Sequence, residues 1–507
     1  MSQSVEYEVK FRQCLAVGQC KNKKYYVNNK DICKIPKFLA CFTKGLPHDI
    51  TGVVDKDEYC KLLEALDTND LKLLQKVKLG GTRKLVNPSA IWEPDVIGRI
   101  RATYKLKAPL RWQSDEFAAQ QLELYCMSLT RDVNFADYAT DPEIIKCADA
   151  LKPFIVTTPA NMYRSEKSPG SLFGPYVSQF FLRTFTMGTL TIEQKYPPYE
   201  PGVDYLTNFA DTLTTQNGNI VGPPMTRLAP RYIITGRDLA TAVHVDEPDQ
   251  YFYQTYCMLA NDLGVPANPG LPVSKVENFF ISEGGKVDAN RLLGEAVALA
   301  METAWVEKWT ILLARPEAMG LEIDYTKNNT NRTGISNVIL DSPILADSFA
   351  KYGSYVLSQG YQEGSPTHPS YPAGHATLSG AASVILKFLF DGDTSINLLQ
   401  PDATGDNLID TGLTSTVGHE IDKLATNIAF GRNFAGIHYR QDARGIQLGE
   451  QVAIYYLRDM VQRYRYPVCV TIKLADGKKV TITNIDAKCS EHKSKHHKCH
   501  SSDSCSC

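Results

Sequence analysis

The sequence predicts an all-α fold of helical bundles with one small C-terminal β-hairpin. Apolar residues recur three and four positions apart in several long segments, as they do on the buried face of an amphipathic helix. Residues 468–485 instead alternate apolar and polar side chains around an Asp-Gly turn, which is typical of a hairpin. The chain has 507 residues, 43% of them hydrophobic, so it can bury a large core.

The helical pattern begins at residue 114. Residues 114–133 form the first predicted helix, with Ser114 as its N-cap, and they follow about 110 residues of short strand-like runs and turns. Residues 152–235 are rich in Pro, Gly and Thr, so we expect loops between short helices there. Further helices are predicted at 237–262, 288–314, 376–390, 419–433 and 439–464.

We expect one domain over residues 1–487, with an amino-terminal part at 1–150 and a catalytic helical core at about 285–465. The low-complexity tail at 488–507 holds four Cys and four His. We expect it to be disordered, with metal binding or a disulfide between chains as the alternatives.

Composition argues against several classes of function. The net charge is -2, which gives no electrostatic reason to bind nucleic acid or an acidic membrane surface. No window reaches the roughly 18 to 20 apolar residues of a membrane span. The first residues lack the apolar run of a signal peptide, so we expect a soluble protein that is cytoplasmic by default.

The chain contains thirteen cysteines, an odd number. Without an export signal, a disulfide framework is not expected. We expect Cys126, Cys147 and Cys257 to be small buried hydrophobic residues.

Two segments carry cationic or titratable residues beside a glycine. In "KWTILLARP", Lys308 and Arg315 are seven residues apart, so both are expected on one helix face. In "HPSYPAGHAT", His368 and His375 flank a turn. Gly374 allows the backbone to approach a ligand closely, and the N–H groups that open the next helix point to the same place.

The third segment is "GRNFAGIHYRQD". Arg432 and His438 are six residues apart, too far around a continuous helix to share a face. We expect Gly431 and Gly436 to allow a break that turns both side chains toward one centre. Asp442 follows His438 by four residues, within reach to orient its ring.

Together the three segments span about 135 residues and carry cationic or titratable groups at the matched positions. An exposed ion-pair surface would instead interleave Asp and Glu with them. Guanidinium groups bind tetrahedral oxyanions through two hydrogen bonds, and lysine adds a compact charge. The pattern therefore predicts a site for phosphate or a phosphate-like ion.

These segments resemble the signature shared by vanadium-dependent haloperoxidases and the type 2 phosphatidic acid phosphatase superfamily. The stretches "FTKGLPHD", "ELYCMSLTRDVNFADY", "VSQFFLRTF" and "ITGRDLATAVHVD" are similar to red-algal and cyanobacterial vanadium bromoperoxidases, so the resemblance covers roughly residues 40–485. It implies two four-helix bundles, a homodimer or higher homo-oligomer, and vanadate (V5+) as cofactor.

The resemblance also implies how the cofactor is held. His438 corresponds to the axial ligand bonded to vanadium. Lys308, Arg315 and Arg432 correspond to the residues that neutralise the vanadate oxygens. Lys308 is further expected to take part in catalysis as a charged hydrogen-bond donor toward hydrogen peroxide.

The turn before the central helix supplies the remaining roles that the resemblance implies. His375 corresponds to the catalytic acid–base residue, and His368 to a second histidine typical of bromoperoxidases. Gly374 would donate its backbone N–H to the cofactor. Ala373 stands where these families usually have a serine that bonds a vanadate oxygen, and losing that hydrogen bond costs about 1.5 to 3 kcal/mol. Gly431, where a serine is common, is a second departure, and we interpret both as tuning.

The implied activity is oxidation of bromide or iodide by hydrogen peroxide to hypohalous acid, which halogenates organic acceptors. The alternative is a soluble acid phosphatase in which His438 is the nucleophile and His375 protonates the leaving oxygen. His368 has no evident role in phosphoryl transfer, which favours the peroxidase. A non-catalytic oxyanion-binding protein is the third hypothesis, and it would bind phosphate without turnover.

Three other residues have less specific interpretations. Arg440 either attracts halide or forms a surface ion pair with Asp442 or Glu450. His244 is expected to be an ordinary helix histidine. Trp305, at helical spacing beside the lysine, is expected to pack in the core.

Overall fold

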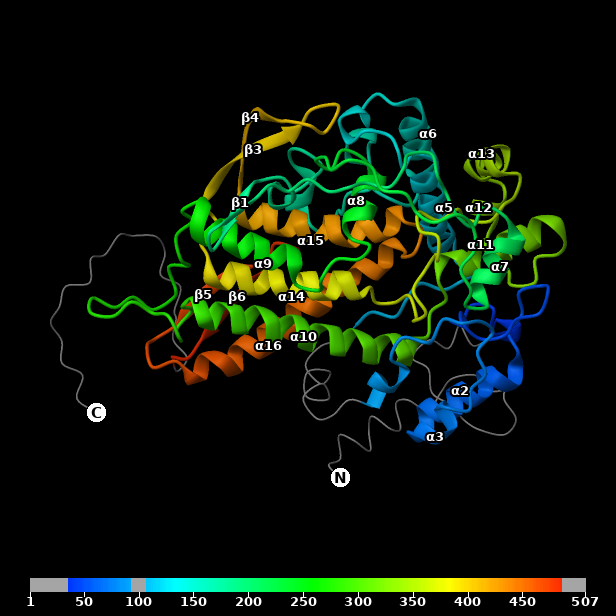
Figure 1. Cartoon of the computed structure of the whole chain (residues 1–507), viewed down its shortest axis with the longest axis horizontal. Coiled ribbons are helices and arrows are strands. Elements are labelled where there is room, and N and C mark those ends of the chain that lie inside the picture. Colours follow the sequence, from blue (N-terminus) through cyan, green and yellow to red (C-terminus); the bar gives the residue numbers. More distant parts are fainter. Residues whose placement is uncertain (1–34, 93–105, 486–507) are drawn as a thin grey trace.

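The structure is a computed structural model that describes residues 35–92 and 106–485. Four long helices form its centre: α10 (Lys286–Ile311), α14 (Gly374–Leu389), α15 (Val417–Phe434) and α16 (Gly445–Met460). Helix α14 contacts the other three, and the four run beside one another in Figure 1. It is buried over almost its whole length, and most of its residues are apolar or small.

Shorter elements surround this centre (Figure 1). The other described helices are α2 (Lys56–Thr68), α3 (Leu71–Leu74), α5 (Asp115–Leu129), α6 (Pro142–Leu151), α7 (Phe209–Gln216), α8 (Gly236–Ala242), α9 (Gln250–Cys257), α11 (Pro316–Asn328), α12 (Asn337–Leu340) and α13 (Pro343–Tyr352). The antiparallel strand pairs are β1 (Phe185–Met187) with β2 (Leu190–Ile192), β3 (Ser395–Pro401) with β4 (Leu408–Thr416), and β5 (Cys469–Lys473) with β6 (Lys479–Thr483).

The helical fold class is confirmed, and the late hairpin is β5–β6, with Cys469 opposite Thr483. Ser114 caps α5 as predicted, because its side chain accepts a hydrogen bond from the backbone N–H of Phe117 at 3.2 Å. The prediction of a single hairpin is wrong, since the described residues contain three strand pairs.

Two helix predictions are also wrong. The region before residue 114 contains α2, whose buried Tyr59, Leu62, Leu63 and Leu66 repeat with helical spacing behind the N-cap Asp55. The helix expected at 237–262 is two helices, α8 and α9, separated by irregular chain that includes a proline, which cannot donate a helical hydrogen bond.

The expectation about cysteines needs one correction. Cys126, Cys147 and Cys257 are buried free thiols, as expected. Cys60 and Cys469, however, are each disulfide-bonded. The Cys/His-rich tail lies outside the described residues.

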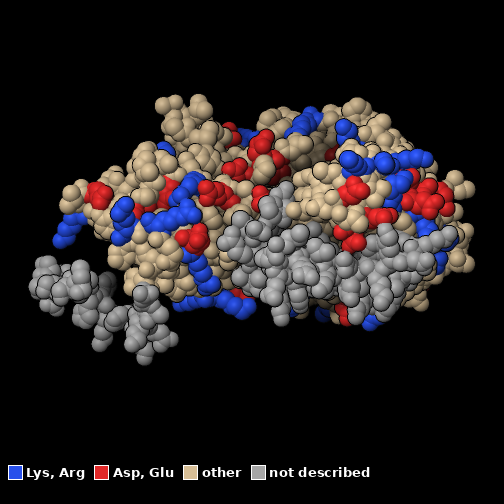
Figure 2. Space-filling view, turned by 90° about the horizontal axis from the view of Figure 1, so that it is seen from below, with Lys and Arg blue, Asp and Glu red and all other residues tan. Residues whose placement is uncertain are grey.

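Among the described residues, no helix is both long and apolar enough to cross a membrane. On the face seen in Figure 2, the visible lysines and arginines are interspersed with aspartates and glutamates. Over the coloured part of this face, a mixed surface of this kind has no extended field of one sign.

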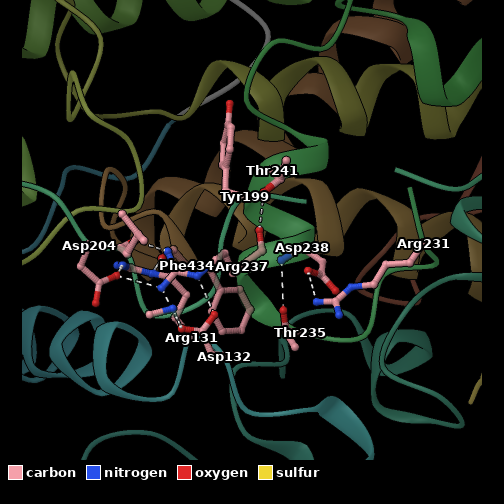
Figure 3. A network of polar contacts seen from close by, with 12 residues as sticks. Arg131, Asp132, Tyr199, Asp204, Arg231, Thr235, Arg237, Asp238, Thr241 and Phe434 are labelled. Carbon is pink, nitrogen blue, oxygen red and sulfur yellow. Dashed lines mark hydrogen bonds and ion pairs between the residues drawn. The ribbon is translucent and has the colours of Figure 1, made fainter. Parts of the chain in front are cut away.

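A network of buried charges fixes α8 to the end of α15 (Figure 3). Arg237, on α8, donates to Asp132 at 2.8 Å and to Asp204 at 3.0 Å. Arg131 also pairs with Asp204, and its Nε donates to the carbonyl oxygen of Phe434 at 2.8 Å. Both arginines are almost fully buried, so these partners offset the cost of removing their charges from water.

Glu450 joins α16 to the β5–β6 hairpin. Its Oε1 accepts the backbone N–H of Ala475 at 2.7 Å, and the residue is 2% exposed. Burial, opposed by the charge of Lys387, raises the pKa of Glu450 to about 7. The folded protein therefore keeps a proton on Glu450 at pH values where the unfolded chain has lost it.

We predict that Glu450→Gln stabilises the protein above neutral pH. Because the folded-state pKa is raised, the free energy of unfolding of the wild type falls as pH rises from about 4.5 to about 7. The glutamine amide keeps the hydrogen bond to Ala475 but does not titrate, so the variant does not lose this stability. The loss in the wild type amounts to about 3 kcal/mol, since each unit of pKa shift corresponds to about 1.4 kcal/mol. Urea unfolding at pH 5 and pH 8 measures the difference between variant and wild type. An equal effect at both pH values, or the same effect in Glu116→Gln at the exposed start of α5, would contradict it.

Candidate oxyanion-binding site

The predicted site residues lie where α10, the turn before α14, and the chain after α15 meet. The turn contains a cis peptide bond between Tyr371 and Pro372. The next backbone N–H, that of Ala373, donates to the carbonyl oxygen of Asp442 at 3.0 Å. The segment that opens α14 is thereby fixed to the segment that follows α15.

Lys308 and Arg315 do not share a helix face, contrary to the prediction. Helix α10 ends at Ile311, Leu312 is left-handed, and Arg315 is the N-cap of α11. The two side chains still reach the same turn, because the chain reverses between them. Lys308 Nζ donates to the carbonyl oxygens of Pro369 at 3.0 Å and Ser370 at 2.8 Å.

His438 is held by groups on both ring nitrogens. Nδ1 is 2.7 Å from the Asp442 carboxylate, which also accepts the hydroxyl of Ser370 at 2.6 Å. An Nδ1–H that donates to a carboxylate leaves the lone pair on Nε2, which is the state of an imidazole that binds a metal. That Nε2 is 2.9 Å from Nη1 of Arg315, so it faces the predicted cations.

The break that brings Arg432 and His438 together occurs at only one of the two predicted glycines. Gly436 has φ +84, which favours glycine, and a Cβ there would lie 2.8 Å from the side chain of Gln359. Gly431 is helical, within α15. A Cβ at Gly431 would lie 2.7 Å from Val243, so close packing against the chain after α8 requires this glycine.

His368 is buried beside Arg315, whose Nη2 is 3.1 Å from Nδ1 of the ring. Trp305 lies against the same ring, with centroids 4.7 Å apart, and 5.8 Å from the ammonium of Lys308. A Cβ on Gly374 would lie 3.0 Å from the indole. Trp305 therefore lines the site, and it also packs against the hydrophobic core, as predicted.

His375 and Arg432 both contact residues 243–246, a segment whose place at the site has no signal in the sequence. Nε2 of His375 is 3.0 Å from Asp246, whose side chain is 4% exposed. Arg432 Nη1 donates to the carbonyl oxygen of Val243 at 2.5 Å. Asp246 is 129 residues before His375, and it was missed because this segment was interpreted as continuous helix.

Arg440 forms an ion pair, but with partners other than those considered. Its Nη1 is 3.0 Å from the carboxylate of Glu166, and its Nε is 2.9 Å from that of Glu123. Because these bonds use the guanidinium group, the halide interpretation of Arg440 has no support in the structure.

The site concentrates positive charge away from water. Burial and the charge of Arg315 lower the pKa of Lys308 well below its ordinary value. Burial also lowers the pKa of Arg315 to about 9, although Asp442 opposes this shift. Burial and the charges of Arg315 and Lys308 lower the pKa of His438. A bound anion would relieve all three shifts, because it would restore favourable interactions for the charged forms.

The donor set fits a small, multiply charged oxyanion. Arg432 Nε is buried and has no hydrogen-bond acceptor within the described ranges. Guanidinium and ammonium donors, an imidazole lone pair on His438 and the helix-opening N–H of Gly374 are the groups that a transition-metal oxyanion needs. The geometry therefore supports the predicted grouping of these residues.

Comparison with known proteins identifies the family. Residues 291–465 match the model of the VCPO second helical-bundle domain. The vanadium-dependent bromoperoxidase of Ascophyllum nodosum is 31% identical over 485 residues, which cover 87% of this chain and 86% of that protein. This chain belongs to the vanadium-dependent bromoperoxidase family. The enzyme of the same name from Corallina pilulifera is 29% identical, over 88% of this chain and 91% of its own.

A solved structure agrees. The homohexameric second vanadate-dependent bromoperoxidase of Ascophyllum nodosum superimposes with a TM-score of 0.83 at 25% identity, over 94% of this chain and 88% of that chain. The helical fold class and the family that the sequence resembles are thereby confirmed, and the chain is an enzyme of the haloperoxidase class.

We predict that Asp246→Asn lowers the pKa of His375 further. Burial already lowers this pKa below its ordinary value of about 6.5, while the charge of Asp246 raises it. Without that charge the ring gains its proton only at a lower pH. NMR titration of the protein with labelled histidine measures the shift. An unchanged or raised pKa, or an equal change in Asp57→Asn at the exposed start of α2, would refute the pairing.

Proposed function

We propose that the chain is a vanadate-dependent haloperoxidase that oxidises bromide or iodide with hydrogen peroxide to hypohalous acid, which halogenates organic acceptors. The observation that carries this proposal is His438, whose Nε2 faces Arg315 while Asp442 fixes Nδ1. The vanadium-dependent bromoperoxidases that cover most of the chain at about 30% identity support the choice of cofactor and halide.

Each side chain has a defined task in this proposal. His438 Nε2 would bind the metal, and Lys308, Arg315 and Arg432 would hold the negative oxygens of the cofactor. Bound vanadate supplies Lewis-acid activation of hydrogen peroxide toward halide. The backbone N–H of Gly374 would add a donor at the start of α14.

His375 would move the proton. Asp246 occupies its Nε2, so Nδ1 is the nitrogen that exchanges a proton with hydrogen peroxide. Lowering of its pKa by burial keeps the ring neutral near pH 7, as a base requires. His368 and Trp305, in contact beside Lys308, would shape the approach of halide.

A phosphatase remains the second candidate, because one observation favours it as well. An imidazole whose Nε2 carries a lone pair and whose Nδ1 is bonded to a carboxylate is a suitable nucleophile for phosphorus once the Arg315 guanidinium turns from Nε2 to the phosphoryl oxygens. Hydrolysis of a phosphate monoester that vanadate inhibits, with no halide turnover, would support this candidate.

We also propose that the chain is a single domain over residues 1–487 that assembles into homo-oligomers. The homohexameric relative supports the assembly. Between α9 and α10, large apolar side chains are exposed: Val273 (89%), Val276 (97%), Phe280 (57%) and Ile281 (67%). Light scattering of the purified protein measures the assembly, and a monomer at micromolar concentration would contradict it.

Vanadate-dependent bromination tests the proposed function. Protein stripped of metal is supplied with orthovanadate, hydrogen peroxide and bromide, and loss of a chlorinated dimedone acceptor is followed. We expect turnover that requires vanadate, disappears in excess phosphate and is absent in His438→Ala. Folded protein that binds vanadate but turns over no halide would refute the haloperoxidase proposal.

We predict that Ala373→Ser tightens vanadate binding about tenfold, since a hydrogen bond to a charged group contributes about 1.5 to 3 kcal/mol. Ala373 is the N-cap of α14 and makes no side-chain cap. The serine hydroxyl can therefore bond either the cofactor or the helix, and the second use would add about 1 kcal/mol of stability. Calorimetric titration with orthovanadate measures the bond to the cofactor, and thermal unfolding measures the bond to the helix. A gain in stability without a gain in affinity would contradict the prediction.

A further inference from the structure

The four residues that follow α8 contact the oxyanion site twice. Val243 and His244 present their carbonyl oxygens to Arg432 Nη1, at 2.5 and 3.5 Å. Asp246 pairs with His375 at 3.0 Å. The position of residues 243–246 therefore determines the orientation of both the Arg432 guanidinium and the His375 ring.

His244 is fixed on three sides. Its Nδ1 is 2.6 Å from the hydroxyl of Tyr199, and its Nε2 is 2.6 Å from the carboxylate of Glu363. Its ring stacks on Tyr361, with centroids 3.7 Å apart and planes within 8°. The side chain is 6% exposed. Since α8 ends at Ala242, the interpretation of His244 as an ordinary helix histidine is wrong.

The other end of this segment is held by α8, which is buried along its whole length. The charge network in Figure 3 fixes Arg237, and Asp238 pairs with Arg231 at 2.9 Å. Thr241 accepts the backbone N–H of Tyr199 at 3.1 Å, so one tyrosine contacts α8 through its N–H and His244 through its hydroxyl. Residues 243–246 are therefore held at their amino-terminal end by α8 and within the segment by the side chain of His244.

Tyr361 provides a second connection between His244 and the site. The guanidinium carbon of Arg432 lies 5.5 Å from the centre of the ring on which His244 stacks. The hydroxyl of Tyr361 donates to the carbonyl oxygen of Ala240, on α8, at 2.6 Å. Displacement of the imidazole would therefore alter the surroundings of Arg432 through the ring as well as through the carbonyl oxygens.

We propose that His244, oriented by Glu363, is a positioning residue of the oxyanion site. It acts through residues 243–246 on Arg432 and His375, and has no contact with the anion itself. The proposal rests on the proposed function only in so far as the site binds a tetrahedral oxyanion. In the anion-free protein, His244 and Glu363 also hold residues 243–246 in place, and this role does not depend on the proposed function.

The first test is orthophosphate binding, measured by calorimetry on the purified full-length chain. His244→Phe keeps the ring stack and removes both hydrogen bonds, and we expect it to weaken binding about tenfold, as for residues that act through a shared element. Glu363→Gln keeps an acceptor for Nε2–H and should stay within about threefold of the wild type. His419→Phe, an exposed histidine at the opposite end of α15 from Arg432, is the matched control and should not change affinity.

A double-mutant cycle separates positioning from general loss of stability. If His244 acts through Arg432, adding His244→Phe to Arg432→Ala should weaken phosphate binding little further, because the anchored guanidinium is already gone. Equal weakening in both backgrounds, or unchanged affinity in a folded His244→Phe protein, would overturn the proposal.

Hydrogen exchange of the anion-free protein provides the readout that does not depend on ligand. We expect faster exchange of the backbone amides of residues 243–246 in His244→Phe, with exchange in α16 unchanged. Unchanged exchange at 243–246 would overturn the positioning role. If the wild type fails to bind phosphate or vanadate, the oxyanion site itself is refuted, whereas the exchange result still decides the role of His244.

Discussion

The contact between Arg315 and His438 is the interaction on which the rest of the site depends. A guanidinium 2.9 Å from an imidazole nitrogen is stable only while that nitrogen carries a lone pair, and Asp442 secures this state at the other nitrogen. Ser370 and the backbone of Ala373 in turn hold Asp442. The turn before α14 and the segment after α15 are therefore constrained by one ring orientation.

The direction of the pKa shift separates two kinds of buried arginine in this chain. Burial alone would lower the pKa of Arg237, but the carboxylates of Asp132 and Asp204 raise it above its ordinary value. Arg315 is equally buried, and its pKa falls to about 9. The protein thus supplies the negative counter-charge for Arg237. The charge of Arg315 is only partly compensated by the protein, and a bound anion would complete the compensation. The same comparison shows that the arginine in the network of Figure 3 has its counter-charges within the protein, and it agrees with the proposal that the cluster at His438 binds an anion.

The residue types of the site could be predicted from the sequence, but their geometry could not. Lys308, Arg315, Arg432 and His438 were recognised because their chemistry suits one ligand whatever the local structure. The prediction that Lys308 and Arg315 lie on one helix face was wrong, because α10 ends between them. Hydrophobic periodicity does not reveal the left-handed residue Leu312 at which it ends. Asp246 was not predicted, and His244 was interpreted as an ordinary helix histidine, because their partners, His375 and Glu363, are more than one hundred residues away. Tertiary contacts of that range leave no local pattern in one sequence.

Determination of the structure of the chain with orthovanadate is the most direct test, with X-ray absorption at the vanadium edge to identify the ligands. We expect one nitrogen ligand, Nε2 of His438, with Lys308, Arg315 and Arg432 against the oxygens. That nitrogen ligand should be lost in His438→Ala. Vanadate bound elsewhere, or held in this pocket without a nitrogen ligand, would contradict it.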